Sequence, residues 1–498
     1  MAIRSGVNDH LYENAPEELS PREPLARWLF GGLAALVVFA VLLGLQLAGV
    51  SHARTRFDQD KFHMVAIAQF AAQLPLIDYR DYASATTPGF HTACAVLVKV
   101  LGAELAVLRA FNAAITAVLV GLLAVIVSRN RSWLSSAALV LPLVCCSYVV
   151  QAGLYVLPDN LAWLLVVVVL GLALHETRKP VPIGAWMFAA LFVAVLVFVR
   201  QIHLWTAGAV WVAAWFGACS SGAGSSGARS SVARGARRGL VLLLPGDGFG
   251  AGVKRVALTA LATLPAVLFL LFFVRLWGGL APPSFQTGVS VTQAGDNEAT
   301  NVVGLSLATP AFILSLLAIY SVFMIAYVWP AIAHRRAVWG WLAAGAIVGF
   351  VLAVLPPTTW QARPRVGGLW QVVKALDVRG VVMFGRTSPL IVVLSTVGGA
   401  FVAAWLCALP VRARWVMGAA LVGFVCAMTA QALSWQRYFE PMLLVWVAIA
   451  ASRAFAVGDV PAGAGLERVM GERARVIGPG LLGAMLLAVT VAAFVGLL

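Results

Sequence analysis

The sequence predicts an all-α protein that crosses a membrane many times, and three observations support this fold class. Of its 498 residues, 61% are hydrophobic and only 11% are charged, and the mean hydropathy is +0.91. Soluble proteins carry about 25% charged residues, so an ordinary soluble fold is excluded. The apolar residues gather in runs long enough to cross a hydrocarbon core of roughly 30 Å as helices. The basic residues gather in alternate loops between these runs.

Thirteen apolar segments are predicted to be transmembrane helices. They span residues 28–50, 106–128, 132–152, 160–176, 183–199, 203–218, 256–277, 306–329, 338–355, 388–409, 415–434, 440–453 and 477–498. The apolar stretch Gly89–Leu101 is too short to span, so we expect a re-entrant or interfacial helix there. About 25 mixed-charge residues precede the first segment and no small-residue cleavage site follows it, so we expect no signal peptide.

The distribution of basic residues predicts the orientation of the protein in the plasma (inner) membrane. With the N-terminus in the cytoplasm, the loops on the cytoplasmic side carry about half of the 35 Lys and Arg residues, as the positive-inside rule requires. The net charge of +15 therefore has an explanation in membrane orientation, and we expect no nucleic-acid partner. Four polar segments are expected on the extracytoplasmic face: residues 51–105, 278–305, 356–387 and 435–439.

We expect three regions along the chain. Residues 1–27 form a cytoplasmic tail, residues 28–453 the transmembrane body, and residues 454–498 a cytoplasmic linker with the last helix. Within the body, residues 51–105 form the first external loop with its interfacial helices, and residues 219–255 form a flexible basic cytoplasmic loop. The six cysteines lie in or beside apolar runs without metal-ligand spacing, so we interpret them as small core residues.

The first external loop contains the densest group of polar side chains. Its sequence Asp58-Gln-Asp60-Lys-Phe-His63 leads into the apolar stretch 61–74, which predicts an interfacial helix. Asp58 or Asp60 is a candidate general base, with His63 a turn away. A helix cap or a structural ion pair is the alternative for these acids. Asp-x-Asp can also hold a hard cation, but the motif alone is weak, and we predict no metal or other cofactor.

Further candidate residues lie between later spans on the same face. Asp159 follows a proline at the start of a predicted span, which is also how an ordinary helix begins. Arg200 and Gln201 lie between two spans, where orientation requires no positive charge, so Arg200 is a functional candidate. We interpret His203 beside them as a satisfied polar residue.

Two arginine-bearing segments complete this face. In Arg437-Tyr438-Phe-Glu440, the arginine either pairs with the glutamate or contacts substrate. The segment 356–386, which ends at Arg386, adds basic residues and tryptophans that suit a phosphate or lipid headgroups. Carboxylates and arginines on one face suit transfer of a group from a phosphate-linked lipid to a hydroxyl.

Short motifs recur along the chain in a fixed order. The first loop contains Gln59-Asp60-Lys61-Phe62-His63, then Gln69, then Thr86-Thr87-Pro88-Gly89-Phe90-His91. Later motifs are Leu108-Arg109 with Asn112, Tyr155 with Asp159, Arg200-Gln201, Gly295-Asp296, and Arg437-Tyr438-Phe439 with Pro441. In this order they resemble the GT-C superfamily of membrane glycosyltransferases, most closely bacterial relatives of the eukaryotic α-1,2-glucosyltransferase that caps the lipid-linked oligosaccharide. That family has an acidic pair, then Phe-His, Gln and Thr-Thr-Pro-Pro-Gly-Leu-Tyr.

The resemblance implies a GT-C-like fold over about residues 28–453 and an inverting glycosyltransferase. Such an enzyme moves a hexose or pentose from a polyprenyl-phosphate donor to a hydroxyl of a glycan, lipid or protein acceptor, on the extracytoplasmic face, in cell-envelope glycan biosynthesis. Asp60 falls on the second acid of the family pair, and Asp58 is displaced by one residue from the first. The resemblance thus leaves the base as Asp60 or Asp58, with Asp60 preferred. Substrate contacts are expected from His63, Asp159, Arg200, Gln201, Arg386, Arg437 and Tyr438.

A polytopic transporter or flippase of a lipid-linked glycan is the alternative function. Many spans and intramembrane arginines are compatible with it as well. Two features of the sequence count against it: there is no internal repeat, and the polar residues gather at one face instead of mid-bilayer.

Overall fold

The computed structural model describes residues 22–175, 183–217, 248–286, 304–333, 336–361, 365–454 and 465–496. Most of the predicted N-terminal tail, most of the basic loop 219–255 and the motif Gly295-Asp296 lie outside these residues. The described chain is almost entirely helical, and its one sheet consists of two strands of two residues each. It is therefore an all-α protein, as the composition predicts.

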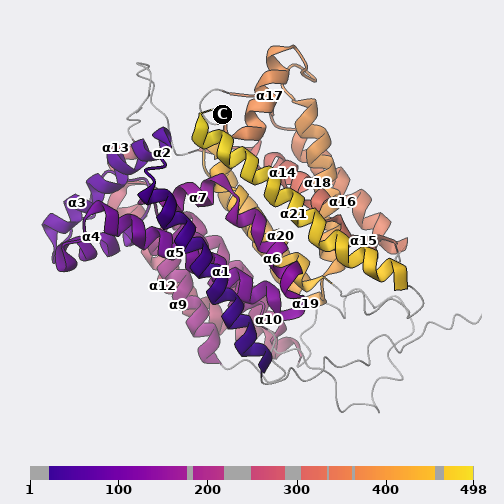
Figure 1. Ribbon diagram of the computed structural model, residues 1–498, viewed down its shortest axis with the longest axis horizontal. Helices are drawn as coiled ribbons and strands as arrows, with labels where there is room; N and C mark the ends of the chain where they lie inside the picture. Colours follow the sequence, from indigo (N-terminus) through magenta and orange to yellow (C-terminus); the bar gives the residue numbers. More distant parts are fainter. Residues whose placement is uncertain are drawn as a thin grey trace, which may run out of the picture.

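The described helices are arranged as shown in Figure 1. In order, the elements are α1 (Arg22–Leu47), α2 (Ala53–Asp58), the π-helix η2 (Gln59–His63), α3 (Met64–Gln73), α4 (Gly89–Leu101), α5 (Leu105–Val127), η3 (Ser128–Asn130), α6 (Trp133–Val144), α7 (Ser147–Leu154), α8 (Asp159–Ala173), α9 (Ile183–Val199), η4 (Gln201–Trp205), α10 (Thr206–Phe216), α12 (Phe249–Trp277), α13 (Pro283–Gln286), α14 (Thr309–Phe323), α15 (Ile325–Ala333), α16 (Arg336–Val354), β1 (Arg365–Val366), α17 (Gly368–Val378), α18 (Pro389–Ala408), α19 (Val411–Thr429), β2 (Ser434–Trp435), η5 (Gln436–Tyr438), α20 (Glu440–Arg453) and α21 (Gly465–Val495).

Seven of the described helices are long and apolar enough to cross a membrane: α1, α5, α12, α16, α18, α19 and α21. Two bent pairs raise this number to nine if each pair is one span: α6 with α7, bent by 70°, and α14 with α15, bent by 87°. The other four predicted spans coincide with α8, α9, α10 and α20, which have 15, 17, 11 and 14 residues. The protein is thus a multi-pass membrane protein.

The outer helices expose apolar side chains that only hydrocarbon can accommodate. Only 17% of the apolar window of α1 and 17% of that of α16 is buried. On α1, Leu29, Leu33 and Leu36 are at least 60% exposed. In water, such exposed apolar helix faces would drive the protein to associate, whereas lipid tails solvate them. By contrast, every residue of α20 is buried, and this helix packs between α5, α6, α14 and α19 at the centre of the molecule.

Close helix packing depends on small residues, most clearly between α16 and α18. A Cβ atom added to Gly349 of α16 would lie 2.1 Å from the backbone oxygen of Ser395 on α18. The neighbouring pair Gly345 and Gly399 leaves equally little room, because a Cβ on Gly399 would lie 2.1 Å from the Gly345 oxygen. In a membrane, such backbone proximity supplies the packing energy that the hydrophobic effect cannot supply between helices.

The polar segments expected on one face meet at one end of the bundle, which we call the polar end. Trp277 Nε1 donates to the oxygen of Tyr79 at 2.8 Å, joining the end of α12 to the first loop. Strand β1 pairs in parallel with β2, joining residues 365–366 to 434–435. In Figure 1, α2 and α13 lie at the upper left and α17 at the top of this end. The polar end therefore unites segments that are distant in sequence, residue 79 with 277 and residue 365 with 434.

At the opposite end, arginines bind the free carbonyls of helix C-termini. Arg131 donates to the oxygens of Ala451 and Ala454 at 2.8 and 2.6 Å, where α20 ends. Arg412 donates to the oxygen of Ala173 at 2.9 Å, where α8 ends. A helix leaves its last four carbonyls without helical partners, and its negative end attracts cations. These arginines belong to the group that the sequence places in cytoplasmic loops, so their capping role adds to any role in orientation.

Candidate functional site

Two carboxylate–arginine pairs lie side by side at the polar end. Arg437 donates to Asp58 Oδ2 at 2.7 Å, and Arg200 donates to Asp159 Oδ1. Tyr438 lies against both arginines: its ring centre is 4.8 Å from the Arg200 guanidinium and 5.0 Å from that of Arg437. The Asp58 and Asp159 side chains keep 19% and 21% of their surface exposed. We call Asp58, Asp159, Arg200, Arg437 and Tyr438, together with His63 described below, the ionic cluster.

A π-turn places Asp58 in this cluster. The N–H of Met64 bonds to the oxygen of Gln59, five residues earlier, so the turn over Gln59–His63 contains one residue more than an α-helical turn. In an α-helix residues four apart share a face, and the extra residue extends this relation to residues five apart. Asp58 thereby faces the same side as His63.

His63 is the sixth member of the ionic cluster and is held by a second histidine. Its Nδ1 lies 2.9 Å from His91 Nε2, and the two rings stack with centres 5.2 Å apart. Burial lowers the pKa of His63 to about 4, although the carboxylates Asp159 and Asp58 act in the opposite direction. His63 is therefore neutral at pH 7. In that state one ring nitrogen can donate a hydrogen bond while the other accepts one.

The remaining members are positioned by the ends of helices. Asp159 is the first residue of α8, where a carboxylate also benefits from the helix dipole. The turn before it is fixed by buried Asn112, whose Nδ2 donates to the oxygens of Tyr155 at 2.6 Å and Leu157 at 2.8 Å. Arg200 has an extended backbone between α9 and η4. Asp159 and Arg200 thus reach the cluster from the ends of two different helices, α8 and α9.

Asp60 lies outside the ionic cluster. Its carboxylate accepts from Gln59 Nε2 at 2.7 Å and lies 3.6 Å from Arg56 Nε, and its side chain is 48% exposed. Residues two apart in a helical turn point to opposite sides, so Asp58 and Asp60 cannot face the same cavity. The expectation that Asp60 would converge with Arg200 and Arg437 is therefore wrong. Asp58 takes that place.

Two further predicted residues have other positions. Gln201 holds the first loop: its Oε1 accepts from the N–H of Thr87 at 3.0 Å, and its Nε2 donates to the oxygens of Ala85 and Leu280. Arg386 is exposed, and among the described residues its side chain has no contact with the ionic cluster. Of the nine predicted site residues, six thus come together, while Asp60, Gln201 and Arg386 do not.

The suggested pair of Arg437 with Glu440 does not form. Glu440 is buried at the start of α20, where it accepts from Gln436 Nε2 at 2.6 Å and from Cys146 Sγ at 3.2 Å. It lies inside the helix break between α6 and α7. Arg437 instead reaches across to Asp58, 379 residues earlier in the chain.

His203 is a residue of the site that the sequence did not single out. It is fully buried, with its ring edge-on to Trp163 at 4.9 Å, and both ring nitrogens lack a hydrogen-bond partner within the described chain. It lines a small cavity together with Arg200 and Tyr438. No protein group among the described residues therefore satisfies the His203 ring, in contrast to the interpretation of His203 as a satisfied polar residue. In the sequence, only the position of His203 three residues after Arg200 could have indicated that it belongs to the site.

The cavities at the ionic cluster are small. One of about 20 Å³ is lined by Asp159, Arg437 and Trp163, and one of about 10 Å³ by Arg200, Tyr438 and His203. Each has room for about one water molecule. Among the described residues, no group of three or more His, Cys, Asp or Glu side chains is placed to hold a metal ion. Neither of these two cavities has room for a substrate larger than water.

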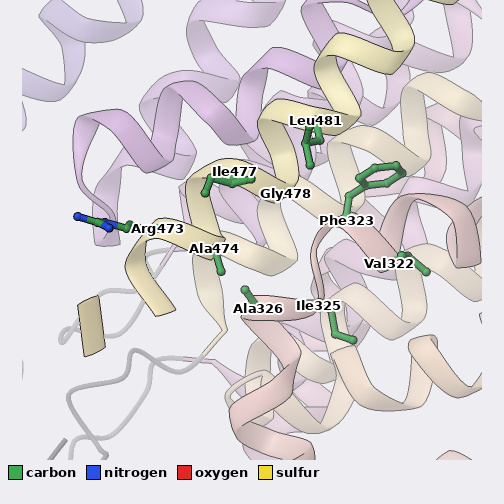
Figure 2. Close-up of a pocket in the computed structure, with 9 residues that line it drawn as sticks. All are labelled: Val322, Phe323, Ile325, Ala326, Arg473, Ala474, Ile477, Gly478 and Leu481. Atoms are coloured by element: carbon green, nitrogen blue, oxygen red, sulfur yellow. The ribbon is translucent and has the colours of Figure 1, made fainter. Parts of the chain in front are cut away.

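Two larger cavities lie elsewhere. One of about 530 Å³ is formed by α14, α15 and α21, and its lining is apolar (Figure 2). Its one arginine, Arg473, points away from the other lining side chains. Another, of about 270 Å³, lies beside Asp60 at the polar end.

Comparisons of the chain with models of protein families, with curated proteins and with solved structures found no match.

Proposed function

We propose that this protein is an inverting GT-C-type glycosyltransferase. It would transfer a hexose or pentose from a polyprenyl-phosphate donor to a hydroxyl acceptor on the extracytoplasmic face. The observation that carries the proposal is the convergence of the ionic cluster. Its six residues come from four motifs spread between residues 58 and 438, and they meet at the polar end beside helices that lie in lipid.

The chemistry needs a base and an anion-stabilising group. The acceptor oxygen attacks the sugar C1, the C1–O bond to the phosphate breaks, and the acceptor proton passes to a carboxylate. The polyprenyl phosphate leaves with an added negative charge, which arginines stabilise through charge-assisted hydrogen bonds. We assign the base to Asp58 instead of Asp60, because Asp58 lies next to Arg437 and near His63.

The two ion pairs suggest that donor binding precedes proton transfer from the acceptor. In the structure the Asp58 carboxylate oxygen Oδ2 is occupied by Arg437 at 2.7 Å. A donor phosphate that binds Arg437 would compete with Asp58 for the guanidinium and leave the carboxylate available for the acceptor proton. In the same way, binding at Arg200 would release Asp159 to contact sugar hydroxyls. Donor binding would thereby open the small cavities of the cluster.

The test is transfer by the purified full-length protein in liposomes. Each member of a panel of polyprenyl-phosphate sugars is supplied with and without candidate acceptors, and release of polyprenyl phosphate is measured. We expect one donor to release polyprenyl phosphate in an acceptor-dependent way. Arg200→Gln should abolish most of this release, whereas the matched variant Arg386→Gln, which changes an exposed arginine outside the ionic cluster, should retain it. Equal activity of the two variants would contradict the proposed site.

Transport of a lipid-linked glycan is the second candidate, and the two bent helix pairs favour it. Transporters bind substrate at discontinuous helices near the middle of the membrane. Here α6 and α7 break beside buried Glu440, and α14 and α15 break at the apolar cavity of Figure 2. Translocation of a fluorescent polyprenyl-phosphate sugar across liposomes, without release of polyprenyl phosphate, would favour this function over transfer.

A further inference from the structure

The polar cavity beside Asp60 is not used by the proposed reaction. It has a volume of about 270 Å³ and lies between the end of α1, the start of α5 and the end of α7. Gln46, Ser51, Arg56, Asp60, Arg109 and Tyr155 supply its polar lining. Because Asp58 and Asp60 face opposite sides of one helical segment, this segment separates the cavity from the ionic cluster. A molecule bound here is therefore not the one that reacts at Asp58.

The cavity lies at the depth of lipid headgroups. Two candidate spans end at it: Pro24–Leu47 finishes at its rim and Leu105–Val127 begins there. Beside it, Leu47 is 81% exposed and Leu105 is 37% exposed, so an apolar surface continues from the cavity toward the hydrocarbon. A ligand with a polar head and an apolar tail matches this arrangement.

One cation in the cavity is fixed and available. Arg109 donates through Nε to Gln59 Oε1 at 3.1 Å, and its guanidinium lies 5.2 Å from the Tyr155 ring centre. These contacts leave the two terminal nitrogens of Arg109 without an acceptor among the described residues. The charge of Asp60 is offset by Arg56 at 3.6 Å. The charged side chains of the cavity, Arg56, Asp60 and Arg109, therefore sum to one net positive charge. Because the Arg109 guanidinium is already held in place, its terminal nitrogens suit a phosphate.

We propose that this cavity binds the phosphate headgroup of an anionic membrane phospholipid. The phosphate accepts from the terminal nitrogens of Arg109, Ser51 and Gln46 line the space for the rest of the headgroup, and the acyl chains lie along the exposed faces of Leu47 and Leu105. Since Gln59 Oε1 also accepts from the N–H of Val156 at 3.2 Å, the bound lipid reinforces the wall behind Asp58. This site does not depend on the transferase proposal.

The matched variants Ser51→Glu and Ser51→Gln test the proposal without removing a contact of Arg109. Both add a side chain of the same size at an exposed position in the cavity lining, and they differ only in charge. Full-length protein is delipidated in detergent and equilibrated with dioleoyl phosphatidylglycerol or dioleoyl phosphatidylcholine. The lipid retained per protein is measured by native mass spectrometry, with no sugar donor present, so the outcome is independent of transferase activity.

We expect wild type and Ser51→Gln to retain phosphatidylglycerol, and Ser51→Glu and Arg109→Gln to bind it about tenfold more weakly, as loss of one charged hydrogen bond would cause. Lys61→Gln removes an exposed cation outside the cavity and should leave retention unchanged. Equal retention by the Glu and Gln variants, or equal retention of phosphatidylcholine, would overturn the proposal. Displacement of the lipid by the same concentration of inorganic phosphate would assign the site to free phosphate and also overturn it.

Discussion

At the residue scale, the choice between Asp58 and Asp60 depends on a single extra residue in one helical turn. The acids are two positions apart and face opposite sides: Asp58 pairs with Arg437, whereas Asp60 lies by Arg56 and lines the cavity that also contains Arg109. The sequence offered both acids of the first external loop as candidate bases. The resemblance favoured Asp60 because this residue falls on the second acid of the family pair, whereas the structure pairs Asp58 with Arg437.

Long-range pairing explains the other residues that sequence reasoning could not place. Glu440 is three residues from Arg437 and looked like its natural partner, yet Arg437 binds Asp58 at a separation of 379 residues. His203 carries no local motif, and its burial against Trp163 depends on how η4 packs. Such contacts arise from the tertiary fold, so local spacing does not reveal them.

A pH prediction follows from buried His63. Its pKa is about 4 in the folded protein against 6.5 for an unperturbed histidine. Between these values the unfolded chain binds a proton that the folded protein does not, so stability falls as the pH drops from about 6.5 to 4. The contribution is at most about 3 kcal/mol. His63→Gln should therefore lose less melting temperature between pH 7.5 and pH 4.5 than wild type does, as measured by scanning fluorimetry. An equal loss would show that His63 does not carry this proton.

At the element scale, the predicted apolar segments all coincide with helices, but their shapes were not predictable. Segments 132–152 and 306–329 are predominantly apolar, and the structure bends them near Cys145 and Met324 by 70° and 87°. Hydropathy depends on composition alone, so it does not show where backbone hydrogen bonds are lost and a helix bends. The short stretch Gly89–Leu101 is, as expected, a helix of 13 residues, and it packs on the predicted interfacial helix α3.

The packing of α16 on α18 gives a prediction with an internal control. Gly349→Ala should lower stability by about 1–3 kcal/mol, because its methyl group would collide with the backbone oxygen of Ser395. Gly340→Ala on the same helix meets open space and should be neutral or stabilising by up to about 1 kcal/mol. The melting temperatures of the two purified variants check this. A lower melting temperature for Gly340→Ala than for Gly349→Ala would contradict the described packing.

At the scale of the whole molecule, the two ends of the bundle have different chemistry. The polar end contains the ionic cluster and the polar cavity, and at the opposite end arginines bind helix carbonyls. Composition predicted the membrane location and the grouping of the four polar segments, because both follow from hydropathy and loop charge. The count of thirteen spans depends on how the short helices cross the bilayer, which hydropathy does not determine.

Orientation can be tested by cysteine labelling. Leu76 at the polar end is 86% exposed, and Phe249 at the start of α12 is 62% exposed. If the polar end is extracytoplasmic, a membrane-impermeant maleimide should label Leu76→Cys in intact spheroplasts above the wild-type background, and Phe249→Cys only after lysis. The reverse pattern would place the ionic cluster on the cytoplasmic side. It would contradict the proposal that the sugar donor is used on the extracytoplasmic face.

The central claim is that Asp58 is the base of a sugar transfer, and the pair Asp58→Asn and Asp60→Asn tests it most directly. Each variant removes one negative charge from the same turn and adds no bulk. With the donor and acceptor found in the panel, release of polyprenyl phosphate should fall by about 10²-fold or more in Asp58→Asn, as loss of a general base requires, and far less in Asp60→Asn. Wild-type release by Asp58→Asn, with loss of release in Asp60→Asn, would contradict the account.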